Sequence, residues 1–141
     1  MSGKPFFVDT NIFVYAYSTQ NAEKREIARR LLSSGQVMTS VQTLNELCNV
    51  LRNKLSSSFD YAEDILREIN CLLPIVPLNY ETTTMALRIS KRYQLSFYDS
   101  LILTAAIQHH CISVLSEDLH HGLILEEGLT VVNPFLLVEE N

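Results

Sequence analysis

The sequence contains no tryptophan, only four glycines and four prolines, and no long apolar run. So little glycine and proline in 141 residues excludes collagen-like and low-complexity classes. The longest nearly apolar stretches, near residues 72–78 and 101–107, are far shorter than the ~20 residues that a membrane-spanning helix needs. We therefore expect a soluble protein that does not enter a membrane.

Cysteine is also scarce. The three cysteines, Cys48, Cys71 and Cys111, are widely spaced and form neither a Cys-x-x-Cys motif nor a zinc-like pattern with histidine. We expect them to be small core hydrophobes in a reducing compartment. Asp9 and Asn11 interrupt the apolar start of the chain, so no signal peptide is expected and the predicted location is the cytoplasm.

Positive charge is in deficit. Eleven lysines and arginines stand against sixteen aspartates and glutamates, which gives a formal net charge of −5. This balance argues against nucleic-acid binding through bulk electrostatics alone. A function on nucleic acid would have to reside in a localised site.

The composition that remains, 47% hydrophobic and 19% charged, is that of one globular domain over residues 1–141. Short apolar runs alternate with longer helical patterns, which is typical of βαβ units around a parallel sheet. The predicted fold class is therefore an α/β sandwich. Strands are predicted at 6–8, 36–38, 75–76, 112–115 and 129–132. Helices are predicted at 22–34, from a cap at Thr39 to about 54, at 61–71, at 80–93 and from 96 onward.

Two features mark the starts of predicted helices. A Thr39-x-x-Gln42 capping box is expected to open the second helix, and Ser96-x-x-Asp99 is expected to open the last one. The last helix is apolar almost all round, so we expect it to lie buried in the middle of a layer.

Two of the predicted strands end in acid. Asp9 follows the first strand, and Glu117 and Asp118 follow the strand that begins at Ile112. Ligands of open parallel sheets bind outside the carboxyl ends of strands, where the strand order reverses. The alternative is that Asp9 and Asp118 only cap following helices, and position alone leaves both interpretations open.

Helical periodicity predicts that the side chain of Asp99 points toward the core. At 100° per residue it lies on the same side of its helix as Ile102 and Leu103, which are core candidates. Capping explains an acid in the first helical turn, but it does not explain this direction. A carboxylate that leans toward a core costs free energy unless it is paired or bound to a cation.

Glu46 lies on the helix face opposite the apolar stripe. Its neighbours on that face are amides: Gln42, Asn45, Asn49 and Asn53. A solvated face usually mixes charges of both signs, whereas one acid among amides suits a polar groove. Both interpretations are kept at this point.

If these acids converge, they require a counter-charge. Oxygen ligands favour magnesium or manganese, and no histidine or cysteine lies in the proposed cluster to select zinc. The pairs His109-His110 and His120-His121 are expected at the surface. A carboxylate-held magnesium ion polarises a phosphate oxygen and activates water, so the leading chemistry is phosphodiester hydrolysis.

Four short motifs resemble those of the PIN-domain ribonucleases, and within them the single-domain VapC-type toxins of toxin–antitoxin pairs. The motifs are Val8-Asp9-Thr10-Asn11, Asn45-Glu46, Tyr98-Asp99-Ser100-Leu101 and Ser116-Glu117-Asp118-Leu119 followed by Gly122. They occur in family-like order and spacing over nearly the whole chain. The resemblance implies a PIN-like three-layer α/β/α sandwich with a central parallel sheet of about five strands.

The resemblance also implies a site, a cofactor and partners. Asp9 and Asp99 would be primary ligands of magnesium or manganese, and Glu46 and Asp118 would complete the catalytic quartet. Three residues would support it: Asn11, Ser116 and Glu117, the last as a competitor of Asp118 for the inward position. The implied partners are single-stranded or looped RNA, a small antitoxin protein and a second copy of the chain. The homodimer would use apolar residues between the middle helices: Leu55, Phe59, Tyr61 and Ile65.

Other functions remain as rivals. The first is a catalytically inactive PIN-like RNA-binding or scaffold domain, which the presence of all four acids disfavours. A response-regulator receiver would need a lysine at the end of the last strand, where this chain has Asn133-Pro134. A phosphatase with an Asp-x-Asp pair is disfavoured because Asn11 is the third member of that triplet.

Overall fold

The computed structural model describes residues 3–136. Its centre is a five-stranded sheet in the order β3-β2-β1-β4-β5, with parallel pairing between all neighbours. The strands are β1 (Phe6–Val8), β2 (Val37–Ser40), β3 (Ile75–Val76), β4 (Ser113–Leu115) and β5 (Thr130–Val132). The predicted parallel sheet is confirmed.

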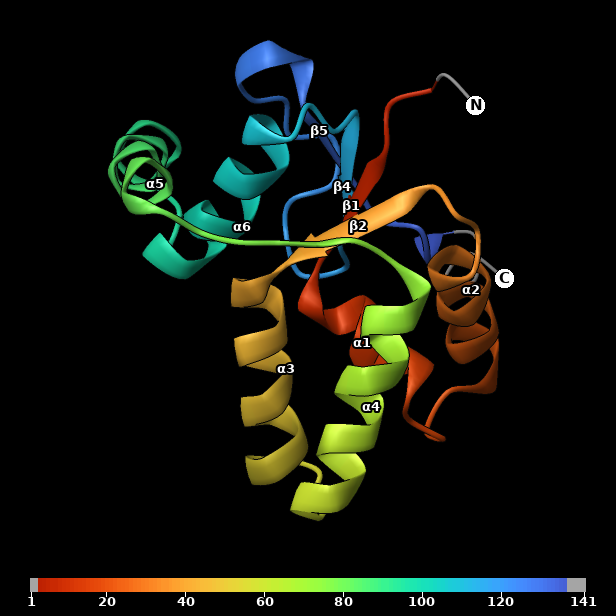
Figure 1. The fold of residues 1–141 in the computed structure, drawn as a ribbon. Helices are drawn as coiled ribbons and strands as arrows, with labels where there is room; N and C mark the ends of the chain where they lie inside the picture. The colour runs from red at the N-terminus through yellow and green to blue at the C-terminus, as the bar shows by residue number, and fades with distance from the viewer. Residues whose placement is uncertain (1–2, 137–141) are drawn as a thin grey trace.

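Helices cover both faces of the sheet, with α1 to α4 on one side and α5 and α6 on the other (Figure 1). They are α1 (Thr10–Ala16), α2 (Ala22–Leu32), α3 (Val41–Asn53), α4 (Phe59–Leu72), α5 (Tyr80–Tyr93) and α6 (Phe97–Gln108). The three-layer α/β/α prediction is therefore confirmed. Within residues 3–136, no helix is long and apolar enough to cross a membrane.

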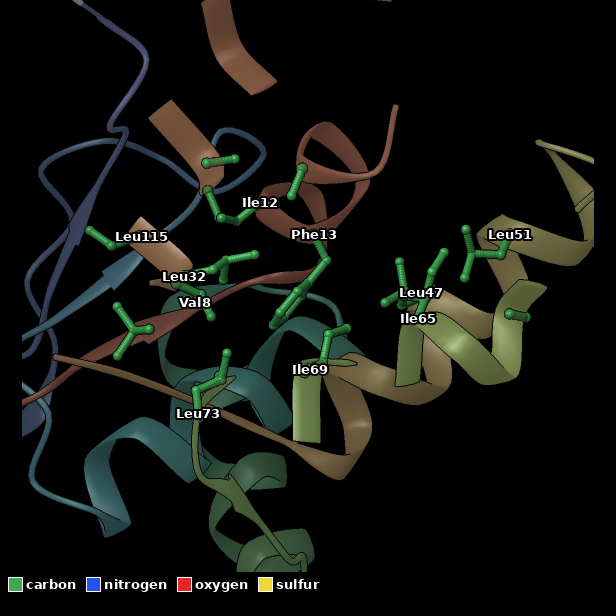
Figure 2. Packing of buried hydrophobic residues seen from close by; sticks show 14 of the residues in the cluster. Val8, Ile12, Phe13, Leu32, Leu47, Leu51, Ile65, Ile69, Leu73 and Leu115 are labelled. Carbon is green, nitrogen blue, oxygen red and sulfur yellow. The ribbon is translucent and has the colours of Figure 1, made fainter. Parts of the chain in front are cut away.

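The alternation of side chains along β1 builds two separate cores. Val8 faces α1 to α4 and belongs to the same buried cluster as Phe13 and Leu47, with Phe13 lying between the other two in Figure 2. Phe7 points to the opposite face and packs with Ile102 and other residues of α6. Both faces of this strand are therefore dry, which explains why its sequence is uniformly apolar.

Helix α6 is buried along nearly its whole length. Every residue from position 100 to position 107 is buried, because α6 lies between the sheet and α5. The prediction of a helix in the middle of a layer is confirmed. Its first turn, which carries Asp99, emerges from the layer beside α3 (Figure 1).

The order of the strands creates one crevice at their carboxyl ends. The chain builds β1, β2 and β3 outward in one direction and then returns to place β4 on the other side of β1. Helices that connect the two halves leave the sheet in opposite directions at this reversal, so the loops after β1 and β4 are the natural place for a site.

Several local predictions were wrong. The helix α1 was not predicted, because its seven residues follow β1 without a turn signal. Thr39 does not cap α3. It lies in β2, where its hydroxyl donates to the carbonyl of Val8 at 2.9 Å, while Ser40 is the N-cap and accepts from the Thr43 amide.

Two residues lie in environments opposite to those predicted. Ile65 is only 2% exposed and belongs to the core between α3 and α4, so it is not available for a dimer surface. Cys71 is exposed, whereas Cys111 is buried as expected and Cys48 is half-buried. The prediction that all three cysteines are core residues is thus wrong for Cys71.

Candidate active site

The site residues come from the loops that follow β1 and β4. Val8 and Leu115 are paired in the sheet, so Asp9 and Ser116 leave neighbouring strands at the same edge. The amide of Asp9 donates to the Leu115 carbonyl at 3.1 Å, which extends the ladder by one bond. Backbone pairing of β1 with β4 therefore brings together residues that are far apart in the chain.

Asp9 is a buried carboxylate, with 5% of its surface exposed. Its Oδ1 accepts from the Thr10 amide at 2.7 Å, and its Oδ2 accepts from the Ser116 hydroxyl at 2.8 Å. The pKa of Asp9 is raised to about 6: burial is the largest cause, the carboxylates of Glu46 and Asp99 add to it, and the two hydrogen bonds oppose it. Asp9 is also the N-cap of α1, so capping and convergence of acids both hold for this residue.

Asn11 joins the two loops. Its Nδ2 lies 3.4 Å from Asp9 Oδ2, 3.2 Å from Ser116 Oγ and 3.3 Å from Asp118 Oδ2. Its Oδ1 accepts from the backbone amide of Glu117 at 3.0 Å. This amide side chain therefore bridges two acids that would otherwise repel each other.

Ser116 holds the second loop in place. It is fully buried and, besides donating to Asp9, accepts from the backbone amides of Asp118 at 3.1 Å and Leu119 at 3.2 Å. The loop leads into turns and bends rather than directly into a helix, so the capping alternative for Asp118 does not apply. Asp118 instead presents an exposed carboxylate beside Asn11.

Glu117 points away from the acids. Its carboxylate forms a salt bridge with Lys24 of α2 and accepts from the Tyr15 hydroxyl at 2.5 Å. Lys24 also lies over the Tyr15 and Phe135 rings, at 5.0 and 5.5 Å from their centroids. Of the two adjacent acids, Asp118 is therefore the one that faces Asp9 and Asn11.

Glu46 and Asp99 approach Asp9 from two other elements. Glu46, on α3, accepts from the Thr10 hydroxyl at 3.3 Å and from Gln42 Nε2 at 3.0 Å. Asp99, in the first turn of α6, is half-buried, and its amide donates to Ser96 Oγ at 3.1 Å. Because both carboxylates raise the pKa of Asp9, the three acids share one electrostatic environment.

Two open hollows meet at Glu46. The first, here called the acid groove, includes Thr10, Asn11, Glu46, Lys54 and Asp118 in its lining. The second, here called the amide cleft, is lined by Gln42, Asn45, Glu46, Asn49 and Tyr98. The polar groove predicted for the amide face of α3 is thus present.

The donor set fits a hard divalent cation in its chemistry and charge. All the side chains that face Asp9 offer oxygen or amide groups, and all four histidines are exposed as predicted. Among residues 3–136, however, no three His, Cys, Asp or Glu side chains are arranged as a ready metal cage. Nor does any lysine or arginine of this part of the chain form a salt bridge with Asp9, Glu46, Asp99 or Asp118.

Comparison with known families identifies the fold. The family model of the PIN domain matches residues 6–122, a segment that holds all four of these acids. The chain belongs to the PIN-domain family. A comparison with curated protein sequences found no match.

Solved structures with the same fold include VapC-type proteins. Mycobacterium tuberculosis VapC20, described as a sarcin-ricin loop cleaving toxin, has a TM-score of 0.67 at 18% identity, over 80% of this chain and 89% of that one. A toxin-antitoxin complex from Klebsiella pneumoniae gives 0.67 at 21% identity, over 91% and 96%. DNA-bound VapBC from Salmonella typhimurium gives 0.65 at 17% identity, over 94% and 99%. The PIN-domain identification made from the motifs is confirmed, and the chain shares its fold with these solved VapC-type structures.

Proposed function

We propose that this PIN domain is an endoribonuclease that depends on magnesium or manganese and acts as the toxin of a toxin–antitoxin pair. The observation that carries the proposal is the buried carboxylate of Asp9, which faces Glu46 and Asp99 with no salt bridge from a described lysine or arginine to balance them. Such an arrangement costs free energy in the isolated domain and gains it when a divalent cation binds.

The position of each residue suggests its role, either as a metal ligand or as a group that orients a ligand. Asp9 and Asp99 would be the main metal ligands, with Glu46 and Asp118 completing the set or holding water. A bound divalent ion would polarise a phosphate oxygen and lower the pKa of water in this site. Ser116 and the Thr10 amide keep the Asp9 carboxylate in one orientation, and Asn11 does the same for Asp118.

The proposed substrate is RNA in single-stranded or looped form. The acid groove has one basic side chain in its lining, Lys54, so it suits a splayed strand better than a duplex. The similar structure VapC20 is described as cleaving a loop, the sarcin-ricin loop. The chemistry of the site, with its acids on the sheet edge, is compatible with the same class of substrate here.

The ribonuclease proposal is tested by incubating purified protein with mixed RNA in magnesium, in manganese and in excess chelator. We expect cleavage with either metal and none with chelator, and Asp99→Asn should remove it. Asp64→Asn, at an exposed position in α4, is the matched control and should cleave normally. Binding of RNA without cleavage under every metal condition would instead identify an inactive PIN-like RNA-binding domain.

The proposed protein partners are an antitoxin and a second copy of the chain. Two of the similar structures were solved as toxin-antitoxin or VapBC assemblies, which supports an antitoxin here. We expect the antitoxin to place an arginine in the acid groove, because a guanidinium binds carboxylates bidentately and would compete with metal. Raising magnesium at a fixed, subsaturating antitoxin concentration should therefore weaken inhibition, and constant inhibition would contradict this mode.

The proposed homodimer would use the exposed apolar residues near the α3–α4 junction. Phe59 is 69% exposed and Tyr61 47% exposed, and Leu55 precedes them in the loop between the two helices. A two-fold axis there would bury this apolar surface between two copies. Light scattering should give twice the mass of one chain, and Phe59→Arg should return it to the mass of one. We place the protein in the cytoplasm, where RNA and an antitoxin would be accessible.

A further inference from the structure

The amide cleft contains an exposed aromatic ring beside the acids. Tyr98 is 63% exposed, although the residues from 100 to 107 that follow it in α6 are all buried. Phe97 packs against it at a centroid distance of 6.0 Å and an interplanar angle of 61°. An aromatic side chain this exposed forgoes much of the free energy that its burial would provide.

The wall opposite Tyr98 is neutral and able to form hydrogen bonds. Gln42, Asn45 and Asn49 occur at intervals of three and four residues, so they line one face of α3. Asn45 is exposed and its side chain makes no hydrogen bond within residues 3–136. Asn49 uses its Oδ1 to accept from Asn53, which leaves its Nδ2 group to donate.

The charges of the two hollows differ. The acid groove has Lys54 in its lining, whereas the only charged side chain among the residues that line the amide cleft is Glu46, and that lining has no lysine or arginine. A phosphate in the amide cleft would meet a carboxylate and no cation. A nucleobase carries no charge, presents donors and acceptors along its edge and has a flat face for stacking.

We propose that the amide cleft is a nucleobase subsite. An unpaired base stacks on Tyr98, its edge bonds to Asn45 and Asn49, and the adjoining phosphate lies over the acids beside Glu46 and Asp99. This rests on the proposed ribonuclease function and adds to it the feature that selects the nucleotide next to the cleaved bond. Tyr98 and the two asparagines act on substrate affinity and sequence preference.

The absence of tryptophan from the chain gives a direct probe. Tyr98→Trp in an Asp9→Asn background creates a single indole in the cleft of a protein that leaves RNA intact. Titration with a short unstructured RNA should quench its fluorescence, because a stacked base quenches indole. Tyr80→Trp in the same background is the control, since Tyr80 is 77% exposed and begins α5 near the end of α6 that lies far from Tyr98.

The second test measures cleavage kinetics in variants that keep Asp9 and the other acids. Tyr98→Ala should raise KM by about 5- to 150-fold, the range expected for one base–aromatic stack, with little change in kcat. Tyr98→Phe should retain the wild-type KM because the ring is kept, and Tyr80→Ala should have no effect. Asn45→Ala should raise KM and change which nucleotide flanks the cleaved bond, with little change in kcat.

The outcomes separate this proposal from the proposed function. Wild-type cleavage, combined with an unchanged KM in Tyr98→Ala and no quenching of the indole in Tyr98→Trp, would overturn the subsite and leave the ribonuclease intact. Quenching of that indole by RNA, in a protein whose wild-type form never cleaves, would support the base subsite and overturn the enzyme. Quenching of the same indole by an antitoxin but not by RNA would assign the cleft to the protein partner and overturn the subsite.

Discussion

Two groups of side chains at the carboxyl ends of β1 and β4 differ in how their negative charge is balanced. Glu117 with Lys24 and Tyr15 is here called the paired cluster, and Asp9 with Glu46 and Asp99 the unpaired cluster. Glu117 is neutralised by Lys24 and receives a hydrogen bond from Tyr15. Asp9 is more deeply buried and faces Glu46 and Asp99, with hydrogen bonds from Ser116 and Thr10 but no salt bridge within residues 3–136. In the paired cluster a cation within the domain balances the carboxylate. In the unpaired cluster the carboxylates have no such cation, so binding of a cation from outside the domain would lower their free energy.

The same comparison explains why adjacent residues have separate roles. Glu117 ties the loop after β4 to α2, and Asp118, one residue later, turns to Asn11 and the acid groove. The salt bridge of Glu117 with Lys24 therefore fixes the position of the loop that carries Asp118. Substitutions in the two clusters should affect different measurements.

The largest expected effect comes from removing the unbalanced charge. Asp9→Asn and Asp99→Asn should each lower metal-dependent RNA cleavage by about 10³-fold, since the metal contributes several kcal/mol to the transition state. Urea unfolding without metal should show Asp9→Asn to be at least as stable as the wild type, because one repulsive carboxylate is gone. Full activity in either variant would contradict the assignment of that residue as a metal ligand.

The second prediction concerns pH. The pKa of Asp9 is raised to about 6 in the folded protein and is near 4 in the unfolded chain, so between these values the folded state keeps a proton that the unfolded chain releases. The free energy of unfolding should therefore fall as pH rises from about 4 to 6, by up to about 3 kcal/mol from this group.

The measurement is urea unfolding without metal at a series of pH values. Subtracting the curve of Asp9→Asn isolates the contribution of this group, and Asp64→Asn provides the exposed control. With saturating magnesium, the difference in unfolding free energy between the wild type and Asp9→Asn should no longer vary with pH in this range. A wild-type curve parallel to that of Asp9→Asn would show that Asp9 ionises normally.

Substitutions in the paired cluster should lower the free energy of unfolding. Lys24→Met keeps the apolar stem over the Tyr15 and Phe135 rings but leaves Glu117 without its cation, at a cost of about 1–3 kcal/mol in unfolding free energy. Arg30→Met breaks the exposed pair with Glu26 and should cost less than about 0.5 kcal/mol. Equal losses in the two variants would show that the Lys24 pair is no more than a surface contact.

The smallest effect should separate the two adjacent acids. Asp118→Asn should reduce cleavage about tenfold at limiting magnesium, in line with the 10- to 100-fold cost of losing a group that orients metal ligands. Glu117→Gln should leave the magnesium dependence unchanged and lower the unfolding free energy instead. Cleavage assays over a magnesium series check both, and the reverse pattern would exchange the roles of these residues.

The sequence predicted the parts of the fold that depend on local pattern. The helix at Tyr80–Tyr93 was predicted with its observed bounds, and the buried helix α6 was recognised from its uniformly apolar composition. The short helix α1 and the N-cap of α3 were missed. In both, tertiary contacts decide: Thr39 donates to β1 instead of capping a helix, and α1 is too short to show a period.

For the site, the chain alone determined which acids were candidates, because Asp9 and Asp118 follow apolar strands, Asp99 shares a helix side with core residues, and Glu46 lies among amides. It could not distinguish Glu117 from Asp118, since that choice depends on Lys24, which lies 93 residues earlier. Nor could it show that Tyr98 is left exposed beside the amide face of α3. Periodicity records which side of its own element a residue occupies, and only the packing of elements decides which charges and rings face one another across the crevice.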